Sequence, residues 1–335
     1  EYDDLLEDRK AITGLTFVDE YKRPREQTPV HVYSFPLQEI SFKDGAKVRD
    51  LDKLAVEENR EDIGKVVLVD LEKRQIHLKK TKKSIDRHPS SIQEYSKVSA
   101  GLLEKSLLTF AEDVVANGLE GRTGAVYDLL LSATPRITGH TGPIRNIDDD
   151  LLEVAKRAVS DLDGSVLPVQ GPPGTGKTYT GAHMILQLIE EGKKVGVTAV
   201  SHKAIENLLV RINKEATKAG VDVSVMHKDK VAEEHRTEGI EYVEKGDEAL
   251  ASIEAHVVGA TAWLWAHEDA ANALDYLFID EAGQMSLAYV LAIARSAHNL
   301  IMLGDPQQLE QPQQAAHPEG ADVSALSHYL GEGQT

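Results

Sequence analysis

The sequence predicts an α/β protein in which a parallel β-sheet, with helices on both faces, follows a small β-barrel and a helical stalk. Three segments of different pattern support this prediction. Residues 146–335 alternate short apolar runs with helical patterns, as doubly wound sheets do. Residues 15–88 show β-like alternation, and residues 91–135 show helical periodicity.

The composition is typical of a globular protein with two or three domains, because 41% of the 335 residues are hydrophobic and 27% are charged. We expect a cytoplasmic protein without a membrane partner, since no apolar stretch reaches the length of a membrane span and residues 1–8 lack a signal-peptide pattern. The absence of cysteine excludes disulfides and zinc–thiolate sites within this segment. The net charge of -18 repels nucleic acid on average, so any such binding must use local patches.

We expect residues 1–145 to form an accessory region. Its β-barrel, over about 15–88, is indicated by β-like runs separated by turn signals. These runs are residues 30–32, 40–42, 66–69 and 76–78. The stalk, over about 91–135, is indicated by apolar residues three or four positions apart and by a helix C-cap at Asn117-Gly118. Residues 138–143 are expected to form a linker.

Residues 73–87 are the clearest basic stretch in an acidic chain. The stretch contains one acidic residue, Asp86, and seven basic ones, which are Lys73, Arg74, Lys79, Lys80, Lys82, Lys83 and Arg87. Two interpretations are balanced: a nucleic-acid-binding patch, and a solvated strand edge whose lysines discourage aggregation. No aromatic residue is interleaved to stack on bases.

Residues 146–335 are expected to form the sheet that carries the chemistry. The strand-like runs are residues 166–169, 195–200, 221–225, 257–258, 274–279 and 300–303. In such sheets ligands bind at the carboxyl ends of the strands, where several of these runs give way to polar residues. Pro168 cannot donate to a sheet ladder, so we expect pairing on one side of its strand to be interrupted.

The run Gly171-Pro-Pro-Gly-Thr-Gly-Lys177-Thr178 matches the phosphate-binding pattern G-x-x-x-x-G-K-[ST] in full, between an apolar run and a helical pattern. Glycines let backbone N–H groups face phosphate oxygens, Lys177 reaches the β- and γ-phosphates, and Thr178 offers its hydroxyl to Mg²⁺. The alternatives are an ordinary Gly-rich turn and a loop that no longer hydrolyses nucleotide. The residues expected to bind nucleotide are Gly171, Pro172, Pro173, Gly174, Thr175, Gly176, Lys177, Thr178 and Tyr179.

Two further runs place polar groups at strand ends. The run 274–279 leads into Asp280-Glu281, where Asp280 is expected to hold Mg²⁺ opposite Thr178 and Glu281 to polarise the attacking water. The alternative is a capped strand end that feeds a helix. The run 300–303 leads into Gln308, which could sense the γ-phosphate or merely belong to a Gly-Asp-Pro turn.

In this order, the motifs Gly-Pro-Pro-Gly-Thr-Gly-Lys-Thr, Asp-Glu-Ala-Gly-Gln and Gly-Asp-Pro-Gln-Gln-Leu resemble those of the first RecA-like domain of superfamily 1B helicases. The resemblance is strongest to bacterial helicases fused to a RecB-like nuclease. It covers residues 166 to about 330, whereas the barrel and stalk fit the family's accessory domain by position alone. The resemblance implies hydrolysis of ATP with Mg²⁺ and a track for single-stranded nucleic acid, with DNA favoured, across the top of the sheet.

Two more stretches resemble the nucleic-acid contacts of this family. The residues they implicate are Ser201, His202, Lys203, Asn207 and Thr261. Hydroxyl, amide and backbone N–H groups at strand ends suit phosphate contacts that ignore base sequence. For Ser201 the alternative is a helix N-cap, and both roles can coexist. Trp263 and Trp265 could stack on a base, although packing is the commoner role for aromatic residues beside a strand end.

The sequence departs from the family pattern in two places. Near the position of the glutamine that reads adenine it has Leu152-Glu-Val-Ala-Lys-Arg-Ala-Val159, so a preference for ATP over other triphosphates is not indicated. It also stops at Thr335, before the second RecA-like lobe whose arginines complete the site in this family. We therefore expect a fragment that binds nucleotide but hydrolyses it slowly, since a missing arginine finger can cost about 10³–10⁵ in turnover.

The leading hypothesis is an ATP-dependent helicase or translocase core, whose partners are single-stranded nucleic acid, the second lobe and a nuclease domain. The rival is a nucleotide-gated binding platform that controls a partner protein or a tethered nuclease. A small-molecule kinase is disfavoured by the residues that follow Asp280 and Gly304.

Overall fold

The computed structural model describes residues 9–24, 26–42, 44–53, 62–95, 100–146, 148–251, 253, 257–308 and 323–331. The chain divides into two compact units, Glu1–Val98 and Ser99–Thr335, which we call the N-terminal and C-terminal units. Within the described residues we find no helix with the length and apolarity that crossing a membrane requires.

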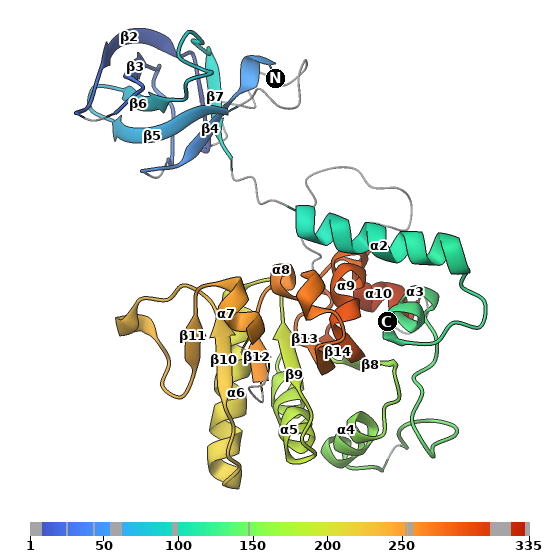
Figure 1. Ribbon diagram of the computed structural model, residues 1–335. Coiled ribbons are helices and arrows are strands. Elements are labelled where there is room, and N and C mark those ends of the chain that lie inside the picture. The colour runs from blue at the N-terminus through green and yellow to red at the C-terminus, as the bar shows by residue number, and fades with distance from the viewer. Residues whose placement is uncertain are drawn as a thin grey trace. The chain divides into compact units, whose positions relative to one another are not determined.

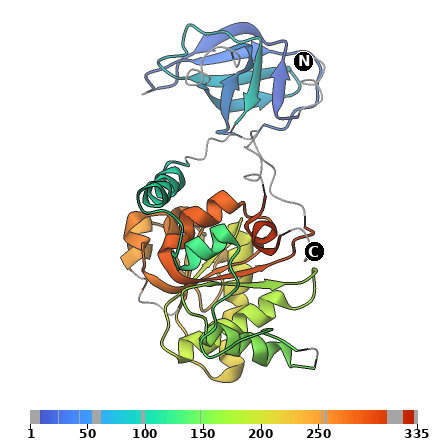
Figure 2. The same cartoon turned by 90° about the vertical axis from the view of Figure 1, so that its right-hand side faces the viewer.

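The N-terminal unit is one antiparallel sheet of seven strands that curls back on itself (Figure 1 and Figure 2). The strands are β1 (Ala11–Thr13), β2 (Thr16–Tyr21), β3 (Val30–Ser34), β4 (Lys47–Asp50), β5 (Asp62–Asp70), β6 (Gln75–Lys80) and β7 (Ser91–Glu94), and a 3-10 turn follows β4 at Leu51–Lys53. Their order is β1-β7-β4-β5-β6-β3-β2. The first and last strands of this order are neighbours in sequence, and alternate residues such as Ile76 and Leu78 on β6 fill the core.

The expected β-barrel is this curled sheet, and two of its strands, β1 and β7, lie outside the expected bounds of 15–88. The strand expected at residues 40–42 is wrong, because that segment has no regular structure. Its apolar side chains, Ile40 and Phe42, still pack against the core. The backbone N–H of Ser41 donates to the carbonyl oxygen of Arg9 (2.6 Å) outside any ladder.

The basic stretch 73–87 is not a solvated strand edge, because β6 pairs with β5 on one side and with β3 on the other. Lys80 is buried and donates to the carbonyl oxygen of Arg87 (2.6 Å), and burial lowers its pKa to about 8. The Arg87 guanidinium forms an ion pair with Asp50 at 2.7 Å. Lys79 pairs with Glu26 at 2.7 Å and Lys73 with Asp70 at 3.4 Å, so four of the seven basic side chains have partners inside the unit. The nucleic-acid patch stays a prediction with fewer available charges.

The C-terminal unit is built on a sheet of seven parallel strands in the order β11-β10-β12-β9-β13-β14-β8. The strands are β8 (Val166–Gln170), β9 (Val195–Thr198), β10 (Val225–Lys228), β11 (Glu241–Val243), β12 (Val257–Gly259), β13 (Leu274–Ile279) and β14 (Ala297–Gly304). The helices are α2 (Gly101–Asn117), α3 (Ala125–Leu131), α4 (Leu151–Ser160), α5 (Lys177–Glu190), α6 (His202–Ala219), α7 (Gly246–Ala251), α8 (Ala262–Trp265), α9 (Leu287–Ile293) and α10 (Ala325–Leu330). Three 3-10 turns occupy Glu233–His235, Glu268–Ala270 and Ala294–Ser296.

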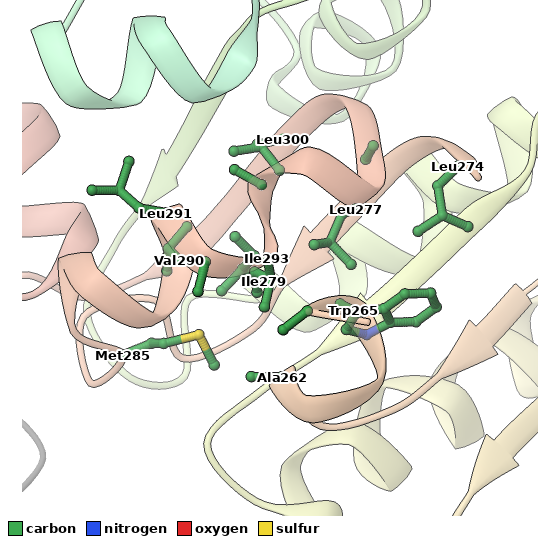
Figure 3. Packing of buried hydrophobic residues seen from close by; sticks show 14 of the residues in the cluster. Ala262, Trp265, Leu274, Leu277, Ile279, Met285, Val290, Leu291, Ile293 and Leu300 are labelled. Atoms are coloured by element: carbon green, nitrogen blue, oxygen red, sulfur yellow. The ribbon is translucent and has the colours of Figure 1, made fainter. Parts of the chain in front are cut away.

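Helices cover both faces of this sheet, as expected. Helices α4, α5 and α6 share one core with the sheet, and α2, α3, α8, α9 and α10 share the other (Figure 1). Strand β13 serves both cores, because Leu277 and Ile279 point to one face while Tyr276 and Phe278 point to the other. Figure 3 shows the first of these cores, in which Leu277 and Ile279 lie among residues of α8 and α9.

Helices α2 and α3, expected as a stalk of the accessory region, lie instead in the same compact unit as the parallel sheet. Their apolar faces explain the difference. Leu103, Phe110 and Leu129 are buried in the core that α9 also lines, and the Ser106 hydroxyl donates to the carbonyl oxygen of Ala292 at 2.5 Å. An amphipathic helix is stabilised by burying its apolar face in such a core, so it packs there and does not form a separate stalk.

The strands of the sheet differ from the expected runs at its far edge. Strand β10 begins only at Val225, and β11 (Glu241–Val243) was not expected, since its three residues include a charged one and give too short a pattern. The expected interruption at Pro168 is confirmed within the described residues. Strand β8 is an edge strand there, paired through β14 alone, so the missing N–H is not needed.

Replacing Phe278 with alanine should lower the free energy of unfolding of the C-terminal unit by about 3–5 kcal/mol, because its fully buried ring would leave a cavity. Urea titration followed by tryptophan fluorescence reports on this unit alone, since both tryptophans, Trp263 and Trp265, lie in it. The control is Val115→Ala on α2, whose side chain is 88% exposed and should change stability by less than about 0.5 kcal/mol. Equal effects of the two changes would contradict the assigned core.

Candidate active site

The parallel sheet brings three sequence motifs to one edge. Strand β14 lies between β8 and β13, with Gly304 opposite Gln170 and Met302 opposite Ile279. The chain leaves all three strands at their carboxyl ends, so the loops that follow them are neighbours. The phosphate loop follows β8, the two carboxylates follow β13, and the loop with Gln308 follows β14.

The phosphate loop has the backbone that an anion site requires. Gly174 and Gly176 have φ of 81° and 88°, a region that side-chain-bearing residues rarely adopt. Helix α5 begins directly afterwards, and no side chain caps it, whereas Asp150 caps α4 and Ser201 caps α6. The first N–H groups of α5 are therefore available to a ligand, at the positive end of the helix dipole.

Lys177 lies over its own loop. Its ammonium group donates to the carbonyl oxygens of Gly171 (2.5 Å) and Pro172 (3.0 Å), and the Thr175 hydroxyl donates to the same Pro172 oxygen at 2.8 Å. A cation held by neutral carbonyls in a half-exposed loop can exchange them for phosphate oxygens, which are stronger acceptors for a charged donor. Thr178 is half-buried at the second position of α5.

Two other members of the expected nucleotide set, Pro173 and Tyr179, are exposed as the glycines Gly174 and Gly176 are. Pro173 is exposed within the loop. The ring of Tyr179 is 40% exposed and contacts the His183 ring edge-on, with centroids 4.4 Å apart. Tyr179 therefore presents an exposed aromatic ring beside the loop. The structure does not define a polar contact between its hydroxyl and a phosphate.

Asp280 is a buried carboxylate with one strong hydrogen bond. Its side chain is 8% exposed, and the backbone N–H of Glu281 donates to its Oδ1 at 2.9 Å. Burial raises the pKa of Asp280 to about 6, although that hydrogen bond and the nearby charge of Lys177 pull the pKa down. An oxygen donor of this kind, near Lys177, suits a hard cation such as Mg²⁺.

Glu281 has a left-handed backbone, with φ of 56°, which is uncommon for any residue other than glycine. The side chain is half-buried, and burial raises the pKa of its carboxyl group. A half-buried carboxylate with a raised pKa, at the carboxyl end of a strand of this sheet, is the kind of group that can act as a general base.

Two glycines, which have no side chain, allow the loops after β13 and β14 to approach each other closely. A side chain at Gly283 would place its Cβ 2.2 Å from the carbonyl oxygen of Asp305, and one at Gly304 would meet the N–H of Gly283 at 2.8 Å. The backbone N–H of Ala282 donates to the carbonyl oxygen of Leu303 at 2.9 Å, which fixes the pair. Sequence analysis did not predict this contact, although both glycines stand in the motifs it identified.

Gln308 joins the same pair of loops. Its Oε1 accepts from the side-chain amide of Gln284 at 3.2 Å, and its backbone N–H donates to the carbonyl oxygen of Asp305 at 3.2 Å. The Gly-Asp-Pro turn and the interaction with the carboxylate loop are thus both present. Gln284 is a site residue that sequence analysis missed.

The residues expected to contact nucleic acid lie farther along the same edge, at the ends of β9 and β12. They are Ser201, His202, Lys203, Asn207 and Thr261. Ser201 is the N-cap of α6, because its hydroxyl accepts from the backbone N–H of Ala204 at 3.1 Å. Lys203 and Asn207 are exposed, and Thr261 precedes α8 without a side-chain cap bond. Their role in binding stays a prediction.

The tryptophans beside Thr261 take part in packing. Trp265 is 1% exposed, and its indole N–H donates to the carbonyl oxygen of Ala260 at 3.1 Å, so base stacking by this residue is ruled out (Figure 3). Trp263 is half-buried and packs edge-on against the Tyr289 ring.

Comparison with known proteins agrees with this geometry. Residues 153–319 match the family model described as an AAA domain. DNA replication ATP-dependent helicase/nuclease DNA2 of Saccharomyces cerevisiae is 31% identical over 150 residues, which are 42% of this chain and 10% of that protein. DNA-binding protein SMUBP-2 of Rattus norvegicus is 34% identical over 113 residues, which are 33% of this chain and 11% of that protein.

Among solved structures, the arterivirus nonstructural protein 10 (helicase) is 14% identical, with a TM-score of 0.35, over 90% of this chain and 51% of that chain. The matched regions span about a tenth of the curated relatives. The family model and these relatives show that the C-terminal unit is similar to AAA domains and to segments of ATP-dependent helicases.

Replacing Gly283 with alanine should lower the melting temperature of the C-terminal unit, because the new Cβ must push the loop of Asp305 away at a cost of about 1–3 kcal/mol. The control is Gly246→Ala at the first position of α7, where a Cβ meets nothing within 4 Å. Differential scanning calorimetry compares the two. A Gly283→Ala protein as stable as the control would contradict the close contact.

Replacing Asp280 with asparagine should stabilise the nucleotide-free protein at pH 7.5 by about 1–3 kcal/mol, since a pKa raised from 3.8 to about 6 makes the buried charge unfavourable. The unfolded chain loses this proton at lower pH than the native protein does, so native stability falls as pH rises through this range. The gain should vanish below pH 3.8, where both states are protonated. Urea titrations at several pH values test this, and a gain independent of pH would argue against the burial.

Proposed function

We propose that this chain carries the first motor lobe of an ATP-dependent DNA helicase or translocase, which hydrolyses Mg·ATP and couples hydrolysis to the binding of a single strand. The observation that carries the proposal is the meeting of the phosphate loop, the Asp280-Glu281 pair and the Gln308 loop at one edge of the sheet. The names of the yeast and rat relatives, a DNA replication helicase/nuclease and a DNA-binding protein, favour DNA as the polymer.

The residues present fit a nucleotide with its metal. The loop N–H groups and the uncapped start of α5 would hold the phosphates, and Lys177 would leave the carbonyl oxygens of Gly171 and Pro172 to reach them. Thr178 and Asp280 would hold Mg²⁺, which neutralises charge on the phosphates when bound. The donors are hydroxyl and carboxylate oxygens, the ligands that this ion prefers.

Glu281 would orient the attacking water and take up its proton, which its raised pKa favours. Gln308 and Gln284 would report the state of the γ-phosphate to the loop after β13, since their side chains are already hydrogen-bonded. Because β9 and β13 are adjacent, a shift of that loop reaches the start of α6, where Ser201, His202, Lys203 and Asn207 would touch the strand backbone.

The family resemblance adds partners that the described residues do not contain. A second RecA-like lobe would supply arginines to the γ-phosphate, and a RecB-like nuclease domain would act on the strand that the motor moves. The rival function, a nucleotide-gated binding platform, predicts nucleotide binding without stimulation of hydrolysis by single-stranded DNA.

Replacing Lys177 with alanine should weaken Mg·ATP binding by at least about tenfold, because a charged contact to phosphate is worth about 1.5–3 kcal/mol. Glu281→Gln should bind nucleotide as the unchanged protein does, yet turn over about 10²–10⁴ times more slowly. Fluorescent-nucleotide titration and phosphate release, with and without single-stranded DNA, separate these effects. The matched control is Lys214→Ala, on the exposed face of α6.

If Lys177→Ala keeps the affinity of the Lys214→Ala control, the phosphate loop does not bind the nucleotide as proposed. If hydrolysis occurs but single-stranded DNA does not raise it, the binding platform is favoured over the motor.

A further inference from the structure

Two histidines and an aspartate meet at the far side of the sheet edge, away from the phosphate loop. His202 is the first residue of α6, His227 lies in β10, and Asp229 follows the end of that strand. Strand β10 is separated from β8 by β12, β9, β13 and β14. The cluster is therefore distinct from the Asp280-Glu281 pair. Neither ATP hydrolysis nor the packing of the cores accounts for it, and the strand contact proposed above involves His202 alone of the three residues.

The spacing of the three side chains is that of metal ligands. The Nδ1 atom of His202 lies 3.4 Å from Nε2 of His227 and 3.4 Å from Oδ2 of Asp229, and one ligand atom from each residue lies within 4.8 Å of the others. Ligands bound tetrahedrally at about 2.0–2.1 Å are separated by about 3.3–3.4 Å, from simple geometry. Two of the three distances between ligand atoms, from His202 to His227 and from His202 to Asp229, have this value without a bound ion.

Hydrogen bonding explains the arrangement less well. Both 3.4 Å contacts are longer than a normal N–H hydrogen bond of about 2.9–3.0 Å. Both also use the same Nδ1 atom of His202, which carries at most one proton. The His227 ring is 1% exposed, and its Nδ1 has no hydrogen-bond partner within the described part of the chain.

We propose that His202, His227 and Asp229 bind one divalent transition-metal ion of the zinc class. Two imidazole nitrogens and one carboxylate oxygen form a donor set that suits Zn²⁺ and Co²⁺ far better than Mg²⁺ or Ca²⁺, which prefer all-oxygen sites.

The surroundings of the three residues determine how an ion can reach the site and how tightly it binds. The side chains of His202 and Asp229 are 42% and 24% exposed, so an ion can enter from solvent and keep a fourth ligand there. Metal-bound histidines usually donate their second N–H to an acceptor, and the lack of one for His227 among the described residues should weaken affinity by about 10–100-fold. We therefore expect reversible binding that ties the start of α6 to the end of β10.

The test is titration of the nucleotide-free 335-residue chain, freed of any affinity tag, with Zn²⁺ in competition with a chromophoric chelator. A parallel titration with Co²⁺ reports geometry, because tetrahedral Co²⁺ has intense visible absorption. We expect one equivalent to bind, a tetrahedral Co²⁺ spectrum, and an increase in melting temperature with Zn²⁺.

Single substitutions locate the ion. His202→Ala and Asp229→Ala should each reduce Zn²⁺ affinity at least tenfold and abolish the Co²⁺ spectrum, and both side chains are exposed enough for folding to survive. The matched controls are His235→Ala, an exposed histidine near by in the chain, and Asp280→Asn at the nucleotide site, and both should keep full binding.

Failure of the unchanged chain to bind Zn²⁺, or equal binding by the Asp229→Ala and His235→Ala proteins, would overturn the proposal. Loss of binding in Asp280→Asn alone would also overturn it, because the ion would then belong to the nucleotide site. None of these outcomes depends on ATP hydrolysis, so they are independent of the function proposed above.

Discussion

The parallel register of one sheet is the constraint on which the site depends. The strands β8, β14 and β13 run in the same direction and lie side by side. The glycine-rich loop, the loop with Gln308 and the pair of carboxylates therefore follow directly from neighbouring strand ends at one edge of the sheet. The alternating side chains of β13 and β14 fill a core on each face of the sheet, which holds these strand ends in place. The site residues are thus positioned by the packing of the two cores on either face of the sheet.

The same edge carries features that are unfavourable for stability. Asp280 is a buried carboxylate, Glu281 has a left-handed backbone, and the Lys177 ammonium group donates, within the described residues, to carbonyl oxygens of its own loop. Each is costly or weakly satisfied in the nucleotide-free protein, and each would be relieved by a polyphosphate with its metal ion. Such a combination is expected at a site where the binding of one ligand supplies the missing interactions.

Most of the C-terminal unit could be predicted from the sequence, because its strands are apolar runs and its motifs stand at their ends. The close approach of Gly283 to Asp305 could not be predicted, since it depends on how two separate loops meet in space. The stalk was placed in the accessory region because periodicity shows that α2 has an apolar face but not which core that face joins. Strand β11 was missed because its three residues are too few for a pattern. The cluster of His202, His227 and Asp229 was missed because His202 stands 25 residues before His227.

The proposed activity requires that Lys177, Thr178 and Asp280 all act on a single bound triphosphate. The most direct measurement is a crystal structure of this chain with Mg²⁺ and a non-hydrolysable ATP analogue. We expect the ammonium group of Lys177 to move from the carbonyl oxygens of Gly171 and Pro172 to the β- and γ-phosphates, with Mg²⁺ held by Thr178 and Asp280. A triphosphate bound elsewhere, or a Lys177 that stays on its loop carbonyls beside the bound analogue, would contradict it.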